Sequence, residues 1–389
     1  MDALHDGMLK ACRNVRWKTS VIRFEANALN NLTLLRRSIL SGAYRIDKYQ
    51  IFQITEPKKR TIAATRLKDR VFQRSLCDNG LYRDITEHFI YDNCACLKGK
   101  GISFAMRRTK RHLQHYFRQH GADGYVLKCD IHNFFGSIDH SKAKQVLSKM
   151  IADPKAYTYV CDVIDSFGGT AGIGLGSQIS QLIALAYLDG LDHYLKDECR
   201  IKYYLRYNDD FYIIHSDKDY LKSLLKEIDS RIRDLGLELN PKTAIHPLRQ
   251  GLAFLKWRLI LTDSGKVILR EAKSKAGRRR RKLRKMLLRE REGSLAKSTA
   301  RQSLDSYLAY MQQGDTYYQR RALIRYFQKT EKEVESMKIL SAEERAYRLE
   351  RENAALRAEV AKKDAQLEYV AMMTDVDMDI FDEEEGEIE

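Results

Sequence analysis

The sequence lacks the features that would place a protein in a membrane or carry it across one. None of its apolar runs reaches the roughly 18 residues of a transmembrane helix, so we expect no membrane-spanning helix. The first residues, Met1–Asp6, have neither the basic segment nor the apolar segment of a signal peptide. We therefore expect a cytoplasmic protein with no membrane partner.

Paired cysteines are also absent. The seven cysteines are odd in number and scattered, and Cys94 and Cys96 form a C-x-C pair with no second pair downstream. This pattern favours free thiols in a reducing compartment over disulfides or a zinc site. The chain has 389 residues, 44% of them hydrophobic and 31% charged, and is long enough for two or three modules with real cores.

Charge is distributed unevenly along the chain. Residues 331–389 hold 8 Lys and Arg against 19 Asp and Glu, whereas residues 1–330 hold 61 against 34. A net charge of +27 on the longer part predicts a polyanionic partner, with nucleic acid as the first candidate. A basic surface that serves only solubility is the alternative.

The most distinctive stretch is Tyr207-Asn208-Asp209-Asp210. It lies between two apolar, aromatic-rich runs, 202–206 and 211–215, which predicts a β-hairpin with two carboxylates at its tip. A further carboxylate, Asp130, follows an apolar strand-like run 79 residues upstream of Asp209. Asp is common in turns because its side chain bonds to the nearby backbone. The Asp209–Asp210 pair therefore indicates a function only together with the other motifs of the chain.

Adjacent like charges repel, and a divalent metal is the usual compensation. Carboxylates from two strands can share two magnesium ions, which serve phosphoryl transfer by holding the attacking and leaving oxygens. The sequence therefore predicts a two-metal site built from Asp130, Asp209 and Asp210.

Three other stretches suit phosphate groups. Residues 51–62 read as a hairpin whose tip carries Lys58, Lys59 and Arg60, donors that match a triphosphate. Lys98-Gly99-Lys100-Gly101 precedes a helix-like run, although the spacing is not that of a P-loop. Residues 168–176 hold five glycines in nine positions, which indicates close backbone approach to a neighbour, or a hinge.

The last third of the chain changes character twice. Residues 273–291 contain 11 cations around an apolar stripe, which predicts a basic amphipathic helix whose Arg278, Arg279, Arg280 and Arg281 contact a sugar–phosphate backbone. Residues 346–370 then follow an a/d heptad register with Asn353 at an a position, typical of a parallel coiled coil. An acidic tail ends the chain, with nine acids and no base from Asp375, and we expect it to be disordered.

The order of these pieces resembles the fingers and palm of reverse transcriptases over roughly residues 50–262. The resemblance implies an α+β right-hand polymerase with an antiparallel-sheet palm, to which the heptad register adds a C-terminal coiled-coil helix. Together these divide the chain into N-terminal helices and fingers (1–124), palm with inserted finger helices (125–262), basic helical thumb (263–330), coiled coil (331–371) and acidic tail (372–389).

The same resemblance assigns roles residue by residue. The metals, two Mg²⁺ ions with Mn²⁺ as a substitute, would be held by the three aspartates and the Ile131 carbonyl, and Lys242 would protonate the leaving pyrophosphate. The nucleotide-binding residues would be Lys59, Arg60, Phe135, Gly176, Ser180 and Gln181, with Phe135 excluding a 2′-hydroxyl. A primer grip would be formed by Phe254, Leu255, Lys256 and Trp257, and Lys98 and Lys100 would bind nucleic acid.

The closing Ser180-Gln181 and the Lys-Gly-Lys-Gly stretch are similar to bacterial reverse transcriptases of diversity-generating retroelements, with group II intron and retron enzymes more distant. Asn208, the coiled coil and the acidic tail depart from that pattern. An antiphage-defence reverse transcriptase working with a structured noncoding RNA is the alternative, and a non-catalytic, maturase-like RNA-binding protein is the alternative of another class. The expected partners are RNA template, primer and dNTPs. Residues 346–370 would join two copies, dock on the thumb or bind an accessory protein.

Overall fold

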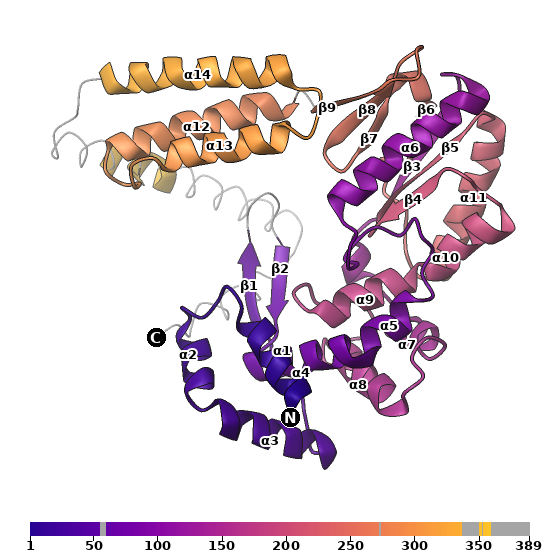
Figure 1. Cartoon of the computed structure of the whole chain (residues 1–389), viewed down its shortest axis with the longest axis vertical. Coiled ribbons are helices and arrows are strands. Elements are labelled where there is room, and N and C mark those ends of the chain that lie inside the picture. The colour runs from indigo at the N-terminus through magenta and orange to yellow at the C-terminus, as the bar shows by residue number, and fades with distance from the viewer. Residues whose placement is uncertain (55–59, 272–273, 337–349, 352, 359–389) are drawn as a thin grey trace, which may run out of the picture. The chain divides into compact units, whose positions relative to one another are not determined.

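The computed structural model describes residues 1–54, 60–271, 274–336, 350–351 and 353–358, which divide into two units (Figure 1). The first unit runs to Ala272 and includes Gly314–Thr316, and the second begins at Lys273.

A four-stranded antiparallel sheet forms the centre of the first unit. Its order is β4-β5-β3-β6, and its strands are β3 (Tyr125–Asp130), β4 (Tyr204–Tyr207), β5 (Asp210–His215) and β6 (Ala244–Pro247). Every pairing is antiparallel. Side chains alternate between the two faces of a strand, so Phe211 and Ile213 lie on one face and Asp210 and Tyr212 on the other.

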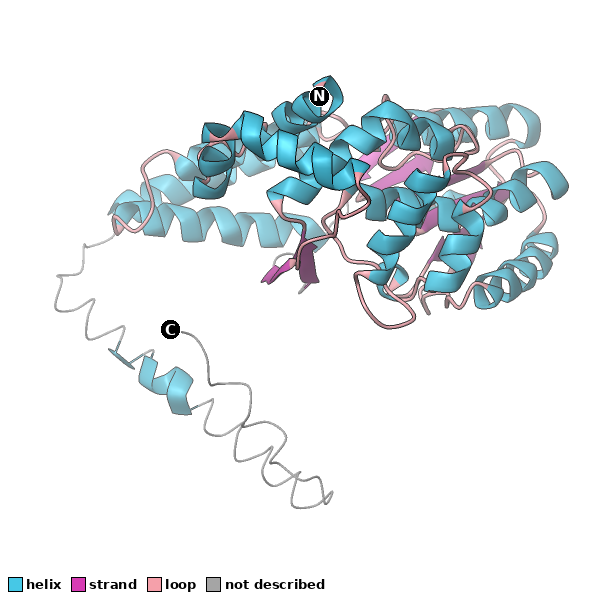
Figure 2. Cartoon of the chain, turned by 90° about the horizontal axis from the view of Figure 1, so that it is seen from below, coloured by secondary structure: helices cyan, strands magenta, loops and turns pink. Residues whose placement is uncertain are grey.

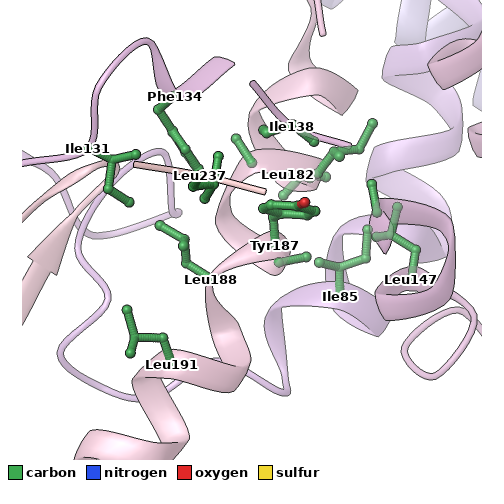
Figure 3. Packing of buried hydrophobic residues seen from close by; sticks show 14 of the residues in the cluster. Ile85, Ile131, Phe134, Ile138, Leu147, Leu182, Tyr187, Leu188, Leu191 and Leu237 are labelled. Carbon is green, nitrogen blue, oxygen red and sulfur yellow. The ribbon is translucent and has the colours of Figure 1, made fainter. Parts of the chain in front are cut away.

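Helices cover both faces of this sheet (Figure 2). The face of Phe211 and Ile213 joins the main hydrophobic core, to which α7 (His140–Leu147), α8 (Pro154–Asp165), α9 (Gln178–Tyr187), α10 (Asp189–His193) and α11 (Lys218–Asp234) contribute. In Figure 3, Ile131, Phe134 and Leu237 pack near Tyr187 and Leu188 in this core. The face of Tyr212 is covered by α6 (Ile102–His120), whose His112 Nδ1 lies 3.0 Å from the Tyr212 hydroxyl.

The N-terminal helices form a second hydrophobic cluster. They are α1 (Asp2–Cys12), α2 (Thr19–Ala26), α3 (Ala28–Leu40) and α4 (Leu67–Leu76), and α5 (Tyr82–Thr86) follows after a π-helical turn. Between α3 and α4 the chain forms the hairpin of β1 (Gln50–Ile54) and β2 (Arg60–Ala64). All five residues of β1 are exposed, so this hairpin stands clear of the core.

A three-stranded antiparallel sheet completes the first unit. It consists of β7 (Leu252–Phe254), β8 (Trp257–Leu261) and β9 (Val267–Glu271). The second unit contains α12 (Ser274–Arg291), α13 (Thr299–Met311) and α14 (Tyr317–Ser336), which share a small core around Leu283, Leu304 and Phe327.

Most of the expected architecture is confirmed: a mixed helix and sheet fold, antiparallel sheets, both predicted hairpins and a basic helix after residue 273. One detail was wrong, because β9 occupies the start of the segment expected to be the basic helical thumb. Among the described residues all seven cysteines are free, and no helix is long and apolar enough to cross a membrane. The coiled coil and acidic tail lie largely outside the described residues and remain predictions.

Gly7 permits the close crossing of α1 and α4. A Cβ at this position would lie 2.7 Å from the Val71 carbonyl oxygen and 3.1 Å from the Ser75 amide nitrogen. Gly7→Ala is therefore expected to destabilise the fold by about 1–3 kcal/mol through overpacking, measured by chemical denaturation. Gly190→Ala is the matched control, since a Cβ there meets nothing within 4 Å and alanine favours the helix. Equal denaturation midpoints for the two variants would contradict the close packing.

Candidate active site

Asp130 and Asp210 face each other at the end of the central sheet. They are paired in the register of β3 and β5. The Asp130 carbonyl accepts a bond from the Asn240 amide at 2.7 Å, so the backbone of Asp130 is turned away from β5. Asp130 and Asp210 therefore form a non-hydrogen-bonded pair, the type in which Cα atoms approach to about 4.5 Å with both side chains on one face.

Asp209 lies in the tight turn beside this pair. Tyr207 pairs with Asp210, which leaves Asn208 and Asp209 as a two-residue loop between β4 and β5. Asn208 adopts a φ of 56°, a left-handed conformation that Asn tolerates better than most residues. The asparagine that departs from the usual reverse transcriptase pattern thus suits the backbone of its own turn.

The carboxyl of Asp210 is electrostatically strained. Its pKa is raised to about 7: burial is the main cause, Lys128, whose ammonium lies 3.5 Å from Oδ1, opposes the rise, and the charges of Asp130 and Asp209 add to it. The Oδ1 atom is buried and has no hydrogen-bond partner. A bound divalent cation would satisfy this oxygen and relieve the repulsion, so the residues present fit such an ion.

The Ile131 carbonyl is directed toward the same place. The bridge between Ile131 and Leu239 is held by the flanking bonds of Asp130 and His132, so the polar groups of Ile131 point away from Leu239, to the side of β5. Within the described part of the chain, however, no three His, Cys, Asp or Glu side chains are gathered tightly enough to make a metal site.

The glycine-rich loop connects Phe135 to the β1–β2 hairpin. The Ile173 amide donates to the Phe135 carbonyl at 2.8 Å, and the Ala63 amide donates to the Leu175 carbonyl at 3.1 Å. Gly176 has a φ of 125°, and a Cβ there would lie 3.1 Å from the Ala63 carbonyl oxygen. The close backbone approach predicted for this loop is therefore made to β2, and it fixes the strand that begins at Arg60 relative to Phe135.

Two polar residues after the loop differ in their exposure. Ser180 is fully buried and its hydroxyl has no hydrogen-bond partner, whereas Gln181 is exposed on the first turns of α9. Lys242 is also exposed, on the loop whose Asn240 is bonded to Asp130. Ser180 therefore cannot line an open pocket directly, although Gln181 and Lys242 have accessible side chains.

The predicted primer grip is divided by the structure. Phe254 and Trp257 are 1% and 2% exposed, and Phe254 packs against Tyr212 with ring centroids 5.2 Å apart. Between them Leu255 and Lys256 form a two-residue turn with φ of 47° and 72°. Only these two can face a bound strand, while the aromatic residues anchor the hairpin.

Two of the cations predicted to bind nucleic acid are engaged by the protein. Lys100 Nζ donates to the Tyr91 carbonyl at 2.7 Å and to the Asn93 carbonyl at 3.0 Å, so it holds a loop. Lys98 lies 3.8 Å from Asp78 and over the Tyr82 ring, but it remains largely exposed.

The arginine run in α12 is also divided. The Arg279 side chain is buried, donates to the Met311 sulfur at 3.1 Å and lies over the Tyr307 ring. Its assignment as a phosphate-binding residue was wrong, because one face of a helix must enter the helical core. The neighbouring arginines 278, 280 and 281 are exposed. Lys59 lies outside the described residues, as does the side chain of Arg60.

Arg206 is the residue that sequence reasoning missed. It is fully buried, and its Nε donates to Asp192 Oδ1 at 2.8 Å while Nη2 donates to Oδ2 at 2.5 Å. Its Nη1 donates to the Asn208 carbonyl at 3.0 Å, inside the turn that carries Asp209, and Nη2 also bonds the Leu185 carbonyl. An arginine within an apolar strand was the available signal, since such a residue needs a buried partner.

Asp130 and Asp210 thus lie opposite each other on neighbouring antiparallel strands, and the glycine-rich loop bonds both to Phe135 and to the β1–β2 hairpin. Residues 46–248 match the family model described as "Reverse transcriptase (RNA-dependent DNA polymerase)", more than half of the chain. The chain therefore belongs to the reverse transcriptase family. No curated protein sequence matches it.

Similar solved structures are telomerases. They include truncated apo telomerase from Candida tropicalis (12% identity, TM-score 0.45, 63% of this chain and 60% of that one). Telomerase from Candida albicans with a TWJ fragment of telomeric RNA has 10% identity and a TM-score of 0.46, over 77% of this chain and 56% of that one. Apo telomerase from Candida tropicalis has 13% identity and a TM-score of 0.45, over 75% of this chain and 58% of that one. The chain thus spans 56–60% of the length of these telomerase chains.

Two neighbouring carboxyls on α10 should respond oppositely to neutralisation. Asp192→Asn leaves the Arg206 cation buried without its counter-charge, which costs about 3–5 kcal/mol of stability. Asp189→Asn instead removes a carboxyl that the fold keeps protonated, because burial and then Asp192 raise its pKa to about 7, against His193 and Arg206.

The pH dependence of the second variant follows from the sign of that shift. Ionisation of Asp189 destabilises the fold as pH rises from about 4, its unfolded pKa, to about 7. Asp189→Asn should therefore raise the unfolding temperature more at pH 8 than at pH 5. Thermal denaturation at both pH values checks this, and a gain that is the same at both would contradict it.

Proposed function

We propose that this reverse transcriptase extends a primer on an RNA template at Asp130, Asp209 and Asp210, as part of a diversity-generating retroelement. The observation that carries the catalytic part is the pairing of Asp130 with Asp210, whose buried Oδ1 makes no hydrogen bond and has the Lys128 ammonium 3.5 Å away. A purely structural pair of carboxyls would be expected to be fully hydrogen-bonded.

When bound, two divalent cations, Mg²⁺ or Mn²⁺, would stabilise the attacking 3′ oxygen and the leaving pyrophosphate oxygen. The three aspartates and the Ile131 carbonyl would hold them. Lys242, accessible beside the Asp130 strand, would give a proton to the pyrophosphate. Lys59 and Arg60 would bind the triphosphate, and the glycine-rich loop bonds both to Phe135 and to Ala63 of β2.

Several further roles belong to this proposal. Phe135 would exclude the 2′-hydroxyl, Gly176 and Gln181 would border the template–nucleotide pocket, and the buried Ser180 would support it from within α9. Leu255 and Lys256 would contact the primer from the turn that Phe254 and Trp257 anchor. The exposed arginines of α12 would contact phosphates from a thumb. The expected domain boundaries are kept in this proposal, except that the thumb helices would begin after β9.

The retroelement role is supported by the Leu175-Gly176…Ser180-Gln181 form and by the Lys98–Gly101 stretch. The heptads of residues 346–370 and the acidic tail favour a second candidate, an antiphage-defence enzyme working with a structured noncoding RNA and assembled through that segment. A non-catalytic, maturase-like RNA-binding protein is disfavoured, because all three aspartates of the site are present.

The carboxylate assignment predicts the behaviour of single substitutions. Asp130→Asn, Asp209→Ala and Asp210→Asn should each lower primer extension on RNA with dNTPs and Mg²⁺ by at least about a hundredfold, because the charge that holds the metals is lost. Asp219→Asn, on an exposed carboxyl at the start of α11, is the matched control and should retain activity. Wild-type and Asp209→Ala proteins giving equal product would refute the site.

Sugar selection tests Phe135 against its neighbour. Phe135 is half-buried, so Phe135→Ala should raise incorporation of ribonucleotides by opening space beside C2′. Phe134 is 3% exposed and belongs to the main core, so Phe134→Ala should lower stability by about 3–5 kcal/mol without changing sugar selection. The measurement is the ratio of rates with each rNTP and dNTP, and an unchanged ratio for Phe135→Ala would reject the role.

A further inference from the structure

The outward side of α6 carries basic side chains that the proposed catalytic roles do not use. Arg107, Arg111, His115 and Arg118 are exposed at steps of three or four residues, so they follow one side of the helix over about 16 Å. The helix, residues 102–120, contains no Asp or Glu. Together with Tyr91, described below, these four residues are called the α6 surface.

These cations have no counter-charge of their own. Arg107, Arg111 and Arg118 form no ion pair within the described ranges, whereas the adjacent Arg108 turns inward and pairs with Asp92 at 2.5 Å. Like charges four residues apart, as at Arg107 and Arg111, destabilise a helix. An anionic ligand bound along this row would relieve that repulsion.

An aromatic platform adjoins the start of this cationic side. Tyr91 is 59% exposed, and its ring meets Phe104 of α6 edge-on at 5.6 Å. The Arg108 guanidinium and the Lys100 ammonium lie 5.1 Å and 5.0 Å from its centroid. The backbone is held as well, because Lys100 donates to the Tyr91 carbonyl. A fixed, exposed ring among cations is the arrangement on which an unpaired base stacks.

The α6 surface begins next to the catalytic turn and runs away from it. Asn93, two residues after Tyr91, bridges to Arg206 in β4, and the Cys94 amide donates to the Arg206 carbonyl at 3.0 Å. From there α6 lies across the sheet (Figure 1). The helix on the opposite face, α11, has mixed charges instead, with pairs such as Lys222–Asp219 and Arg233–Asp229.

We propose that the α6 surface binds an unpaired stretch of RNA adjoining the template–primer duplex, with phosphates on Arg107, Arg111 and Arg118 and a base on Tyr91. Cations alone would suit any polyanion, but the stacking platform selects a nucleic acid strand with exposed bases. The proposal rests on the proposed function only in taking RNA as the partner.

Binding without catalysis tests it. The full chain is titrated, in EDTA, with a blunt RNA–DNA duplex and with the same duplex carrying a ten-nucleotide unpaired RNA extension at either end. One extension should tighten binding by about tenfold or more. Arg107→Glu with Arg111→Glu should abolish that gain and reduce the slope of log affinity against log salt by about 1.4, at about 0.7 for each phosphate contact of a single strand.

Two further variants separate stacking and charge. Tyr91→Ala should lose most of the gain, and Tyr91→Phe should keep it, because the ring is retained. Lys222→Glu with Lys226→Glu, the same charge change on α11, should leave the gain intact. Circular dichroism of each variant verifies folding.

Two results would overturn the proposal: no tightening by either extension, or equal losses for the α6 and α11 variants. The first would mean that the surface serves another anion, and the second that only net charge matters. A wild-type protein that binds as described but extends no primer in Mg²⁺ would instead refute the catalytic proposal and leave this one standing.

Discussion

Mutual repulsion among Asp130, Asp209 and Asp210 is the constraint on which the rest of the first unit depends. Two unit charges about 4 Å apart repel by roughly 1 kcal/mol in water and several times more where water is partly excluded. The cation closest to Asp210 is Lys128, at 3.5 Å, and it does not prevent the rise of the Asp210 pKa. The carboxyls must therefore be held together by backbone geometry rather than by their own attraction.

That geometry is fixed from behind the sheet. Arg206 lies on the face opposite Asp210, where it joins Asp192 of α10, the Leu185 carbonyl of α9 and the Asn208 carbonyl of the turn. A buried ion pair of this kind adds little net stability over an apolar substitute, but its directional bonds require one arrangement. Here the bonds of Arg206 fix the position of the turn that carries Asn208 and Asp209. The same helix α9 begins at the glycine-rich loop, so the turn and the β1–β2 hairpin are fixed to a common element.

The sequence was sufficient wherever local chemistry decides the structure. The hairpin at 204–215 follows from a short polar turn between apolar runs, and the basic helix after residue 273 follows from its cations around an apolar stripe. It was insufficient where a side chain meets a partner far along the chain. Arg206 with Asp192, Arg108 with Asp92 and Arg279 with Met311 depend on packing that no local pattern encodes. Ser180 was misplaced for the same reason, since helix periodicity does not reveal which polar side enters the core.

This limit bears most strongly on the interpretation of charge. Arg107 and Arg108 are adjacent, yet one faces outward and the other pairs inside, because successive helical residues differ by about 100°. Arg278 and Arg279 divide in the same way. A net charge of +27 over residues 1–330 therefore overstates the positive charge that faces outward. Among the exposed basic residues, Arg107, Arg111 and Arg118 lie in a row on α6, whereas α11 carries mixed charges. Under the proposed function such a row would orient a bound strand as well as attract it, and that orientation would help to bring a template to the three aspartates.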